Sequence, residues 1–294
     1  MRAFFEKRAP FVMVFPTLIV LLIIAVVPLI YVLRLSFTES TLSAPFKAFI
    51  GFDNFARAFS DETFGRSLVN TLFFAFTVTL LETLIGFVMA LAFQSEKRLG
   101  GVVRTLALLP LFTPPVAIAM IWRLIYDPNS GLINHYLNNW GILETAVGFL
   151  GNPQLAMPAI MLADIWQWTP FTFLLCLAAL QALPKSAYEA ANVDGASNWQ
   201  IFRRLTLPLV SPAVIVIFLF RFLIALKVFD LVFILTYGGP GSVTNVASFY
   251  IYRVGFTQFN TGYAAALSIL VLLLISVVTT FMTVGRDLIL KRLN

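Results

Sequence analysis

Residues 69–93 read VNTLFFAFTVTLLETLIGFVMALAF, and Glu82 is the only charged residue among them. A helix needs roughly 20 mainly apolar residues to cross the hydrocarbon core of a bilayer, so this stretch is long enough. It lacks the apolar–polar alternation of a barrel strand, and a helix satisfies its own backbone hydrogen bonds. The stretch therefore predicts a membrane-spanning helix.

The rest of the chain has the same character. It has 294 residues, of which 60% are hydrophobic and 12% are charged, and its mean hydropathy is +0.90. A soluble domain carries about twice that charged fraction. We therefore expect one all-α membrane domain over residues 1–294, with six transmembrane helices. The predicted spans are residues 11–33, 69–93, 104–125, 156–181, 210–235 and 264–285.

The first span is expected to be retained, because it is longer than the apolar core of a signal peptide and no small-residue cleavage site follows it. Lys and Arg are concentrated at the two ends of the chain and in the second and fourth connections, where twelve lie against five on the other side. By the positive-inside rule, both termini are cytoplasmic, in the cytoplasmic (inner) membrane. This distribution also explains the net charge of +6 without a nucleic-acid partner.

The connection between the fourth and fifth spans has a structure of its own. Ser186 and Glu189 fit a capping box that begins a helix, and Gly195 is suited to ending it. Ser197 then begins a second, amphipathic helix, which Pro208 is expected to end. Three interpretations fit this hairpin: an element lying in the membrane interface, a DNA-reading helix-turn-helix, or a docking element for a cytoplasmic partner. The second is disfavoured, because both ends are tied to membrane spans.

At this connection the chain resembles the integral membrane subunits of ATP-binding-cassette importers. Their signature is E-A-A, three residues, Gly, and nine residues later L-x-L-P. The resemblance extends over nearly the whole chain, and LAALQALPKSAYEAANVDGA and KVFDLVFILTYGGPG are similar to the carbohydrate subclass, of the maltose and glycerol-phosphate type. It implies a cytoplasmic coupling helix between spans 4 and 5 that contacts an ATPase. The residues implied are Glu189, Ala190, Ala191, Gly195, Leu207 and Pro208.

The resemblance also implies the partners. They are a second permease subunit (forming a heterodimer), two ATPase subunits that bind ATP and Mg, an extracytoplasmic solute-binding protein, a sugar substrate and the surrounding membrane lipid. No lysine of this chain follows a glycine, so a P-loop is not expected here. The chain is predicted to be a non-catalytic subunit that binds no cofactor itself. No metal site is expected, since the single histidine, His135, has no companion ligands.

Charged residues inside spans are functional hypotheses by default. Those predicted within or near the spans are Glu82, Asp164, Arg221, Lys227 and Asp230. Mutual pairing is the plain alternative, with Lys227 and Asp230 on one helix and Asp164 facing Arg221.

The stretch DIWQWTPFTF, residues 164–173, places polar and aromatic side chains at helical spacing around Pro170. Such a stripe suits a sugar, whose hydroxyls need partners and whose C–H faces lie against rings. The stripe consists of Asp164, Gln167, Trp168 and Phe171. The resemblance adds Arg221, Ile224 and Ala225 in the fifth span to the substrate pathway. Interhelical packing remains the alternative for each of these residues.

A rival in another functional class is a self-sufficient secondary carrier or channel for small polar solutes, with the charged span residues as an ion relay. An intramembrane enzyme would need a nucleophile and a base, or a carboxylate pair, at fixed spacing, and the scattered acids do not supply one. A structural anchor would leave the intramembrane charges unexplained.

Overall fold

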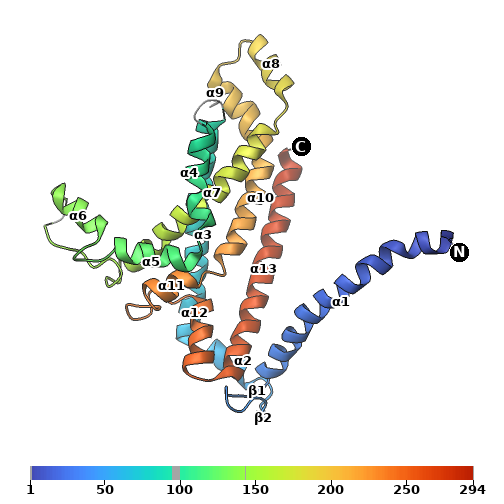
Figure 1. Cartoon of the computed structure of the whole chain (residues 1–294), viewed down its shortest axis with the longest axis vertical. Helices are drawn as coiled ribbons and strands as arrows, with labels where there is room; N and C mark the ends of the chain where they lie inside the picture. Colours follow the sequence, from blue (N-terminus) through green and yellow to red (C-terminus); the bar gives the residue numbers. More distant parts are fainter. Residues whose placement is uncertain (1, 95–99, 143, 294) are drawn as a thin grey trace. The chain divides into compact units, whose positions relative to one another are not determined.

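The computed structural model describes residues 2–94, 100–142 and 144–293, and most of them lie in helices (Figure 1). The chain divides into two compact units. The first comprises Met1–Glu62 and Ile251–Leu273, and the second comprises Thr63–Tyr250 and Leu274–Asn294. That the two units together form one transmembrane domain remains a prediction.

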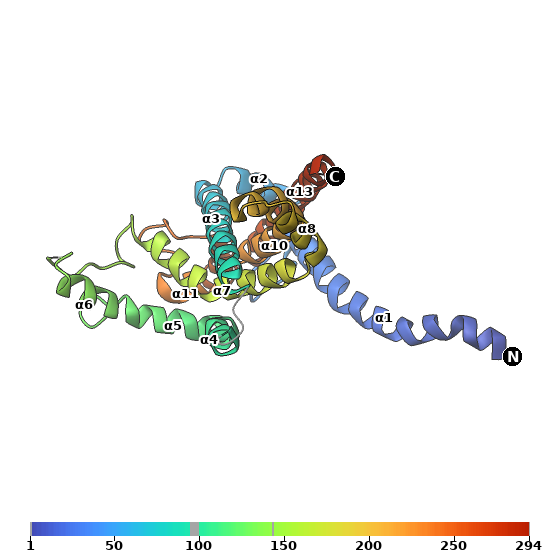
Figure 2. The ribbon, with the colours of Figure 1, turned by 90° about the horizontal axis from the view of Figure 1, so that it is seen from above.

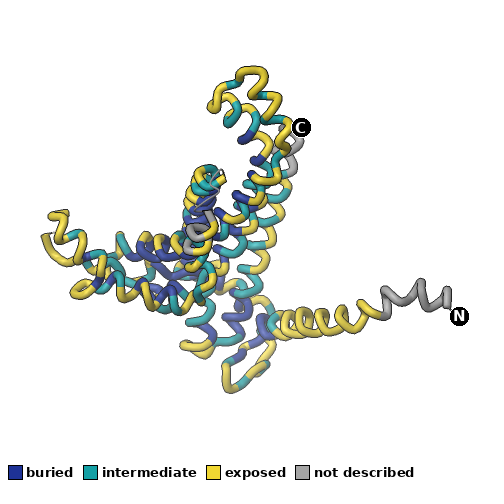
Figure 3. The backbone as a smooth tube through the Cα atoms, turned by 45° about the horizontal axis from the view of Figure 1, so that its top comes forward, coloured by how far each residue is buried: buried dark blue, intermediate teal, exposed yellow. Residues whose placement is uncertain are grey.

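The first unit is built on a helix that is apolar on all sides. Its elements are α1 (Arg2–Ser36), β1 (Thr38–Glu39), β2 (Ala48–Phe49), α2 (Asp53–Phe59), the π-helical turn η2 (Arg253–Thr257) and the first part of α13 (Thr261–Leu293). From Met13 to Tyr31 every side chain of α1 is exposed, as Figure 3 shows near the N-terminus. Lipid is the medium that such a helix requires.

A short ribbon follows α1 and corrects the prediction of an all-α chain. Thr38 pairs with Phe49 in an antiparallel register between β1 and β2. The buried Asn54 of α2 fixes this turn, since its Nδ2 donates to the carbonyl oxygens of Ser36 and Thr38 at 3.0 and 3.1 Å. These strands could not be predicted from the sequence, because they are only two residues long and are held by a side chain distant in sequence.

The second unit is a bundle centred on one helix. Its elements are α3 (Glu62–Phe93), α4 (Gly100–Phe112), α5 (Pro115–Ile125), α6 (Leu132–Asn139), α7 (Ala156–Gln181), α8 (Lys185–Val193), α9 (Asn198–Ile201), the π-helical turn η1 (Phe202–Thr206), α10 (Leu207–Ala225), α11 (Asp230–Leu235), α12 (Ala247–Tyr252) and the end of α13. The helix α7 contacts α3, α4, α5, α10 and α11 (Figures 1 and 2). Most of its side chains are therefore buried.

Within the described residues, five helices are long and apolar enough to cross a membrane. They are Met13–Ser36, Glu62–Phe93, Ala156–Gln181, Asn198–Ala225 and Thr261–Arg286. The fourth predicted span, residues 156–181, coincides with α7. The third, 104–125, is two helices separated at Thr113 and Pro114, because consecutive prolines cannot continue the hydrogen-bond ladder. The fifth was predicted to run from 210 to 235 but is helical only to Ala225 before a break.

The α3–α7 crossing is very close and requires a glycine. A Cβ on Gly86 would lie 2.6 Å from the backbone nitrogen of Phe173 and would clash with Thr172. Beside this crossing, a buried apolar cluster that includes Ala90, Phe173 and Val210 joins α3, α7 and α10. Close helix packing through a small residue is typical of membrane bundles.

Candidate functional site

A cavity of about 200 Å³ lies where α7, α10 and α11 meet. Six of the seven predicted pathway residues line it, and they are Asp164, Gln167, Trp168, Arg221, Ile224 and Ala225. Two separate stretches of sequence therefore meet at one cavity. Helical spacing predicted the residues of the first stretch, and the family resemblance implied those of the second.

The seventh predicted residue, Phe171, does not line this cavity. Its ring stacks on that of Phe220 at 6.0 Å, and it borders an apolar groove between α7 and α10. Its edge contact with Trp168, with ring centroids 6.0 Å apart, leaves it next to a cavity residue but on another side of the helix. The 3–4 spacing predicted that Phe171 shares a helix face with Asp164, Gln167 and Trp168. It could not show that Phe171 lies at the edge of that face and points away from the cavity.

A break in the helix forms one wall of the cavity. The helix α10 ends at Ala225 and α11 begins at Asp230, and the intervening Lys227 and Val228 line the cavity. The carbonyl oxygen of Val228 accepts a hydrogen bond from Ser248 Oγ. The predicted ion pair between Lys227 and Asp230 is absent from the described contacts, because the two residues do not share one continuous helix.

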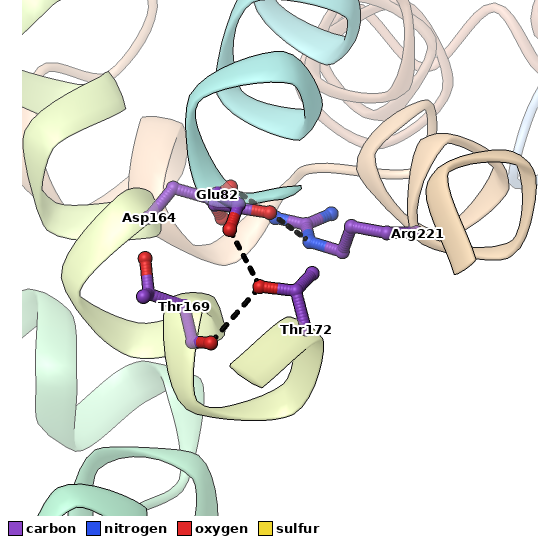
Figure 4. A network of polar contacts seen from close by, with 5 residues as sticks. All are labelled: Glu82, Asp164, Thr169, Thr172 and Arg221. Carbon is purple, nitrogen blue, oxygen red and sulfur yellow. Dashed lines mark hydrogen bonds and ion pairs between the residues drawn. The ribbon is translucent and has the colours of Figure 1, made fainter. Parts of the chain in front are cut away.

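Buried charges at the cavity come from three helices (Figure 4). Arg221 of α10, which is 0% exposed, binds Glu82 of α3 with two nitrogens, at 2.6 Å from Nε to Oε2 and 2.9 Å from Nη2 to Oε1. Its Nη2 also donates to Asp164 Oδ2 of α7. The predicted pairing of Asp164 with Arg221 is confirmed. The paired charges connect α3, α7 and α10 inside the bundle.

Glu82 is the buried charged residue for which the sequence predicted no partner. It is 0% exposed and supplies the bidentate contact to Arg221, whereas Asp164 supplies a single one. The available signal was its position as the lone charge of residues 69–93. A buried charge in a span requires a partner, but sequence spacing within one helix could not indicate a partner on another.

Aromatic and amide groups complete the wall of the cavity. The guanidinium carbon of Arg221 lies 4.8 Å from the centre of the Trp168 ring, a cation–π geometry. Gln167 Nε2 donates to the carbonyl oxygen of Thr113 at 3.4 Å, at the break between α4 and α5. The cavity thus combines an aromatic ring, an amide, a carboxylate and a guanidinium.

The segment between α7 and α10 is the second candidate region, and its first helix differs in detail from the prediction. The helix α8 begins at Lys185 after Pro184, and Ser186 makes no capping hydrogen bond. The predicted capping box of Ser186 and Glu189 is therefore wrong, because Pro184 already occupies the N-cap position and the helix starts two residues early. Glu189 is exposed and has no polar partner within the described part of the chain.

The predicted glycine turn is present. Gly195 has φ +72°, and its nitrogen donates to the carbonyl oxygen of Asn192 at 3.1 Å while Ala196 N donates to Ala191 O at 3.0 Å. This pair of bonds is a Schellman motif. The second capping box is also confirmed, since Ser197 Oγ accepts from the Gln200 backbone and the Gln200 side chain accepts from Ser197 N.

Pro208 does not end the second helix, contrary to prediction. The chain passes through η1, in which Leu207 N donates to Phe202 O, and continues as α10 with Pro208 in its first turn. The wider π turn accommodates a residue that has no N–H and whose ring would clash with the preceding turn. Tyr188 Oη donates to Thr206 Oγ1 at 3.0 Å and ties α8 to this turn.

A family model described as "Binding-protein-dependent transport system inner membrane component" matches residues 82–291. The chain belongs to this family. It is a non-catalytic, multi-pass permease subunit of an ATP-binding-cassette importer of the inner membrane. Family membership sets aside the self-sufficient carrier, the intramembrane enzyme and the structural anchor as descriptions of this permease.

Curated relatives cover most of the permease. The trehalose/maltose transport system permease protein MalF of Thermococcus litoralis is 36% identical, over 96% of this chain and 95% of the relative. The trehalose transport system permease protein SugA of Mycobacterium tuberculosis is 32% identical, over 90% of this chain and 84% of the relative.

A solved structure has the same fold. It is a bacterial alginate ABC transporter in complex with an alginate pentasaccharide-bound periplasmic protein, and one of its chains has a TM-score of 0.85. That chain is 29% identical in sequence, and the match covers 99% of the permease and 98% of the alginate transporter chain.

Proposed function

We propose that this permease translocates a sugar or sugar derivative and that the cavity on α7 and α10 belongs to its pathway. The observation that carries the proposal is that the ring of Trp168 shares one cavity with Gln167 and Asp164. A sugar presents hydroxyl groups that need hydrogen-bond partners and C–H faces that pack on an aromatic ring. The relatives named for trehalose, maltose and alginate support the same class of solute.

The size of the cavity supports a shared pathway. Its volume of about 200 Å³ is below the range of about 300–1,000 Å³ that is usual for complete small-molecule sites. A second, similar permease subunit would supply the remaining walls in a heterodimer. The break at residues 226–229 lets backbone and side chains together face the solute, as is common where transporter helices are discontinuous.

The topology that fits these observations has six crossings. The five long helices supply five of them, and the broken pair α4 and α5 supplies the third in chain order. The Lys and Arg distribution supports a cytoplasmic position for both termini and the α8–α9 segment.

The α8–α9 segment is the proposed coupling element. Glu189 is exposed and free of partners in the described contacts, so its carboxylate is available to a basic group of an ATPase. Gly195 supplies the left-handed turn that folds α8 against α9, and Pro208 lies where this segment joins α10. Ala190, Ala191 and Leu207 complete the predicted docking set.

In the proposed assembly, two ATPase subunits bind ATP and Mg, and an extracytoplasmic binding protein delivers the sugar. Closure of the ATPase subunits moves the α8–α9 segment, and the spans then alternate access to the cavity. The permease supplies the pathway and the coupling surface, while hydrolysis occurs on its partners.

ATP-driven uptake by the complete importer in vesicles, with trehalose and maltose as probes, tests the cavity. Trp168→Ala should reduce uptake at least tenfold while ATP hydrolysis without sugar is retained, because the stacking surface is lost. Trp166→Ala is the matched control, since Trp166 lies on the same helix but does not line the cavity. Equal uptake by the two variants would refute the assignment of the site.

The coupling assignment has its own test. Glu189→Ala combined with Gly195→Asp should abolish uptake while leaving the chain in the membrane, because it removes the carboxylate and strains the turn at φ +72°. Ser186→Ala is the control, since Ser186 makes no capping bond. Normal transport by the double variant would show that the segment does not couple.

A further inference from the structure

The charged cluster at the cavity contains more negative than positive charge. One guanidinium, Arg221, is bound by the two carboxylates of Glu82 and Asp164. The formal charge of these three groups is −1. Lys227 and Asp230 also line the cavity and add one positive and one negative charge, so the total remains −1. A guanidinium at a solute site usually favours anions, but this one is already matched twice.

The two carboxylates differ in their access to the cavity. Asp164 lines it, whereas Glu82 lies on α3, is 0% exposed and is not among the lining residues. Glu82 nevertheless makes the bidentate contact, through Nε at 2.6 Å and Nη2 at 2.9 Å. The geometry therefore separates a carboxylate that neutralises Arg221 from one that meets the solute.

Glu82 is held in place by backbone contacts at the α3–α7 crossing (Figure 4). Thr172 Oγ1 donates to the carbonyl oxygen of Glu82 at 2.6 Å and also lies 2.9 Å from that of Thr169. Gly86, one turn further along α3, allows this approach. These contacts fix the backbone of Glu82 against α7 without engaging its carboxylate.

We propose that Glu82 is a positioning residue that sets the charge selectivity of the cavity: it neutralises Arg221, so that Asp164 meets neutral, hydroxyl-rich solutes and anionic ones are disfavoured. Asp164 accepts hydrogen bonds from hydroxyl groups, and Trp168, 4.8 Å from the guanidinium carbon, covers a face of Arg221. A carboxylate on the solute would instead meet a cluster with excess negative charge in a medium that screens poorly. The inference rests on the proposed carbohydrate pathway and selects a class within it.

Relatives do not decide this point. One is named for trehalose and maltose, and a solved relative is described as importing the acidic polysaccharide alginate. The second relative is 28% identical with a TM-score of 0.85, so the same fold serves a solute described as acidic. Charge selectivity must therefore be tested on this permease.

The test compares uptake of trehalose with uptake of its uronate, in which one hydroxymethyl group is replaced by a carboxylate. The complete importer is assayed in vesicles with ATP, and the binding protein is the same throughout, so its own preference cancels between variants. Glu82→Gln removes one negative charge while conserving shape. The ratio of neutral to anionic uptake should fall about tenfold or more.

Two further variants make the result specific. Asp164→Asn removes the same charge from the cavity side and should shift the ratio in the same direction, so the test survives if Glu82→Gln fails to fold. Thr172→Val removes the hydroxyl that holds the Glu82 backbone and changes no charge. It should lower uptake of both probes and leave their ratio unchanged.

The outcomes separate this inference from the function on which it rests. If the permease without substitutions takes up neither probe, the sugar pathway itself fails. If it takes up trehalose but both charge variants keep the original ratio, Glu82 acts only in packing and the inference is overturned.

Discussion

Replacing Arg221 by leucine should be far more damaging than replacing an ordinary buried residue. Arg221 is 0% exposed and makes three charge-assisted contacts, two with Glu82 and one with Asp164. Two of these contacts are hydrogen bonds, from Nη2 to Glu82 and to Asp164, and at about 1.5 kcal/mol net for each their loss costs about 3 kcal/mol. This agrees with the cost of about 3–5 kcal/mol for removing one partner of a buried ion pair. Since 1.4 kcal/mol corresponds to a tenfold change in an equilibrium constant, the ratio of folded to unfolded protein should fall by a factor of about 100 to several thousand.

Thermal denaturation of the purified, complete importer in detergent measures this effect as a lowered midpoint. The control is the double variant Arg221→Leu with Glu82→Leu, which removes the orphaned carboxylate of α3 together with its partner. Apolar replacement of a buried pair is often nearly neutral, so the double variant should recover much of the lost stability. A single variant as stable as the starting protein, or a double variant no better than the single, would refute the reasoning.

Three further outcomes are expected. Gly86→Val should destabilise the α3–α7 crossing by about 1–3 kcal/mol in thermal denaturation, whereas Gly65→Ala, in open space on the same helix, should be neutral or slightly stabilising. Ser197→Ala should speed amide exchange in α9 by the loss of about 1 kcal/mol of capping, and Ser186→Ala should not change exchange in α8. Hydrogen bonds from the Ser130 backbone and hydroxyl lower the pKa of Asp127, so its turn gains stability above the usual pKa of about 3.9. That gain is lost as pH falls through the lowered pKa, and exchange at Ser130, corrected for its intrinsic rate, should rise only there.

The helical spans were largely predictable because their signal is local. A run of apolar residues must be helical in lipid, and residues 156–181 were predicted with the bounds of α7 itself. The cavity residues Asp164, Gln167 and Trp168 also followed from local helical spacing. Each of these inferences needed only one segment of the chain.

The misassigned details depend on contacts between segments or on local alternatives of similar energy. Glu82 and Arg221 are 139 positions apart, and no pattern in either stretch of sequence indicates that the two residues pair. Ser186 had the right residue three positions later, yet Pro184 began the helix first. Pro208 was expected to end the helix, but the π turn at Phe202–Thr206 lets the helix continue through it. Sequence pattern ranks such alternatives poorly because their free energies differ by little.

The π turn at Phe202–Thr206 has a mechanical consequence. Because it lets the chain pass Pro208 without breaking, residues Asn198–Ala225 form one rod of 28 residues. At 1.5 Å per residue, the rod is about 42 Å long. It carries Ser197 and the glycine turn at one end and the cavity residues Arg221 and Ile224 near the other. A tilt of roughly 10° about the Ala225 end would sweep Asn198 through about 7 Å at this length. A stiff rod of this length would act as a lever, converting a large displacement of Asn198 into a small one of Arg221.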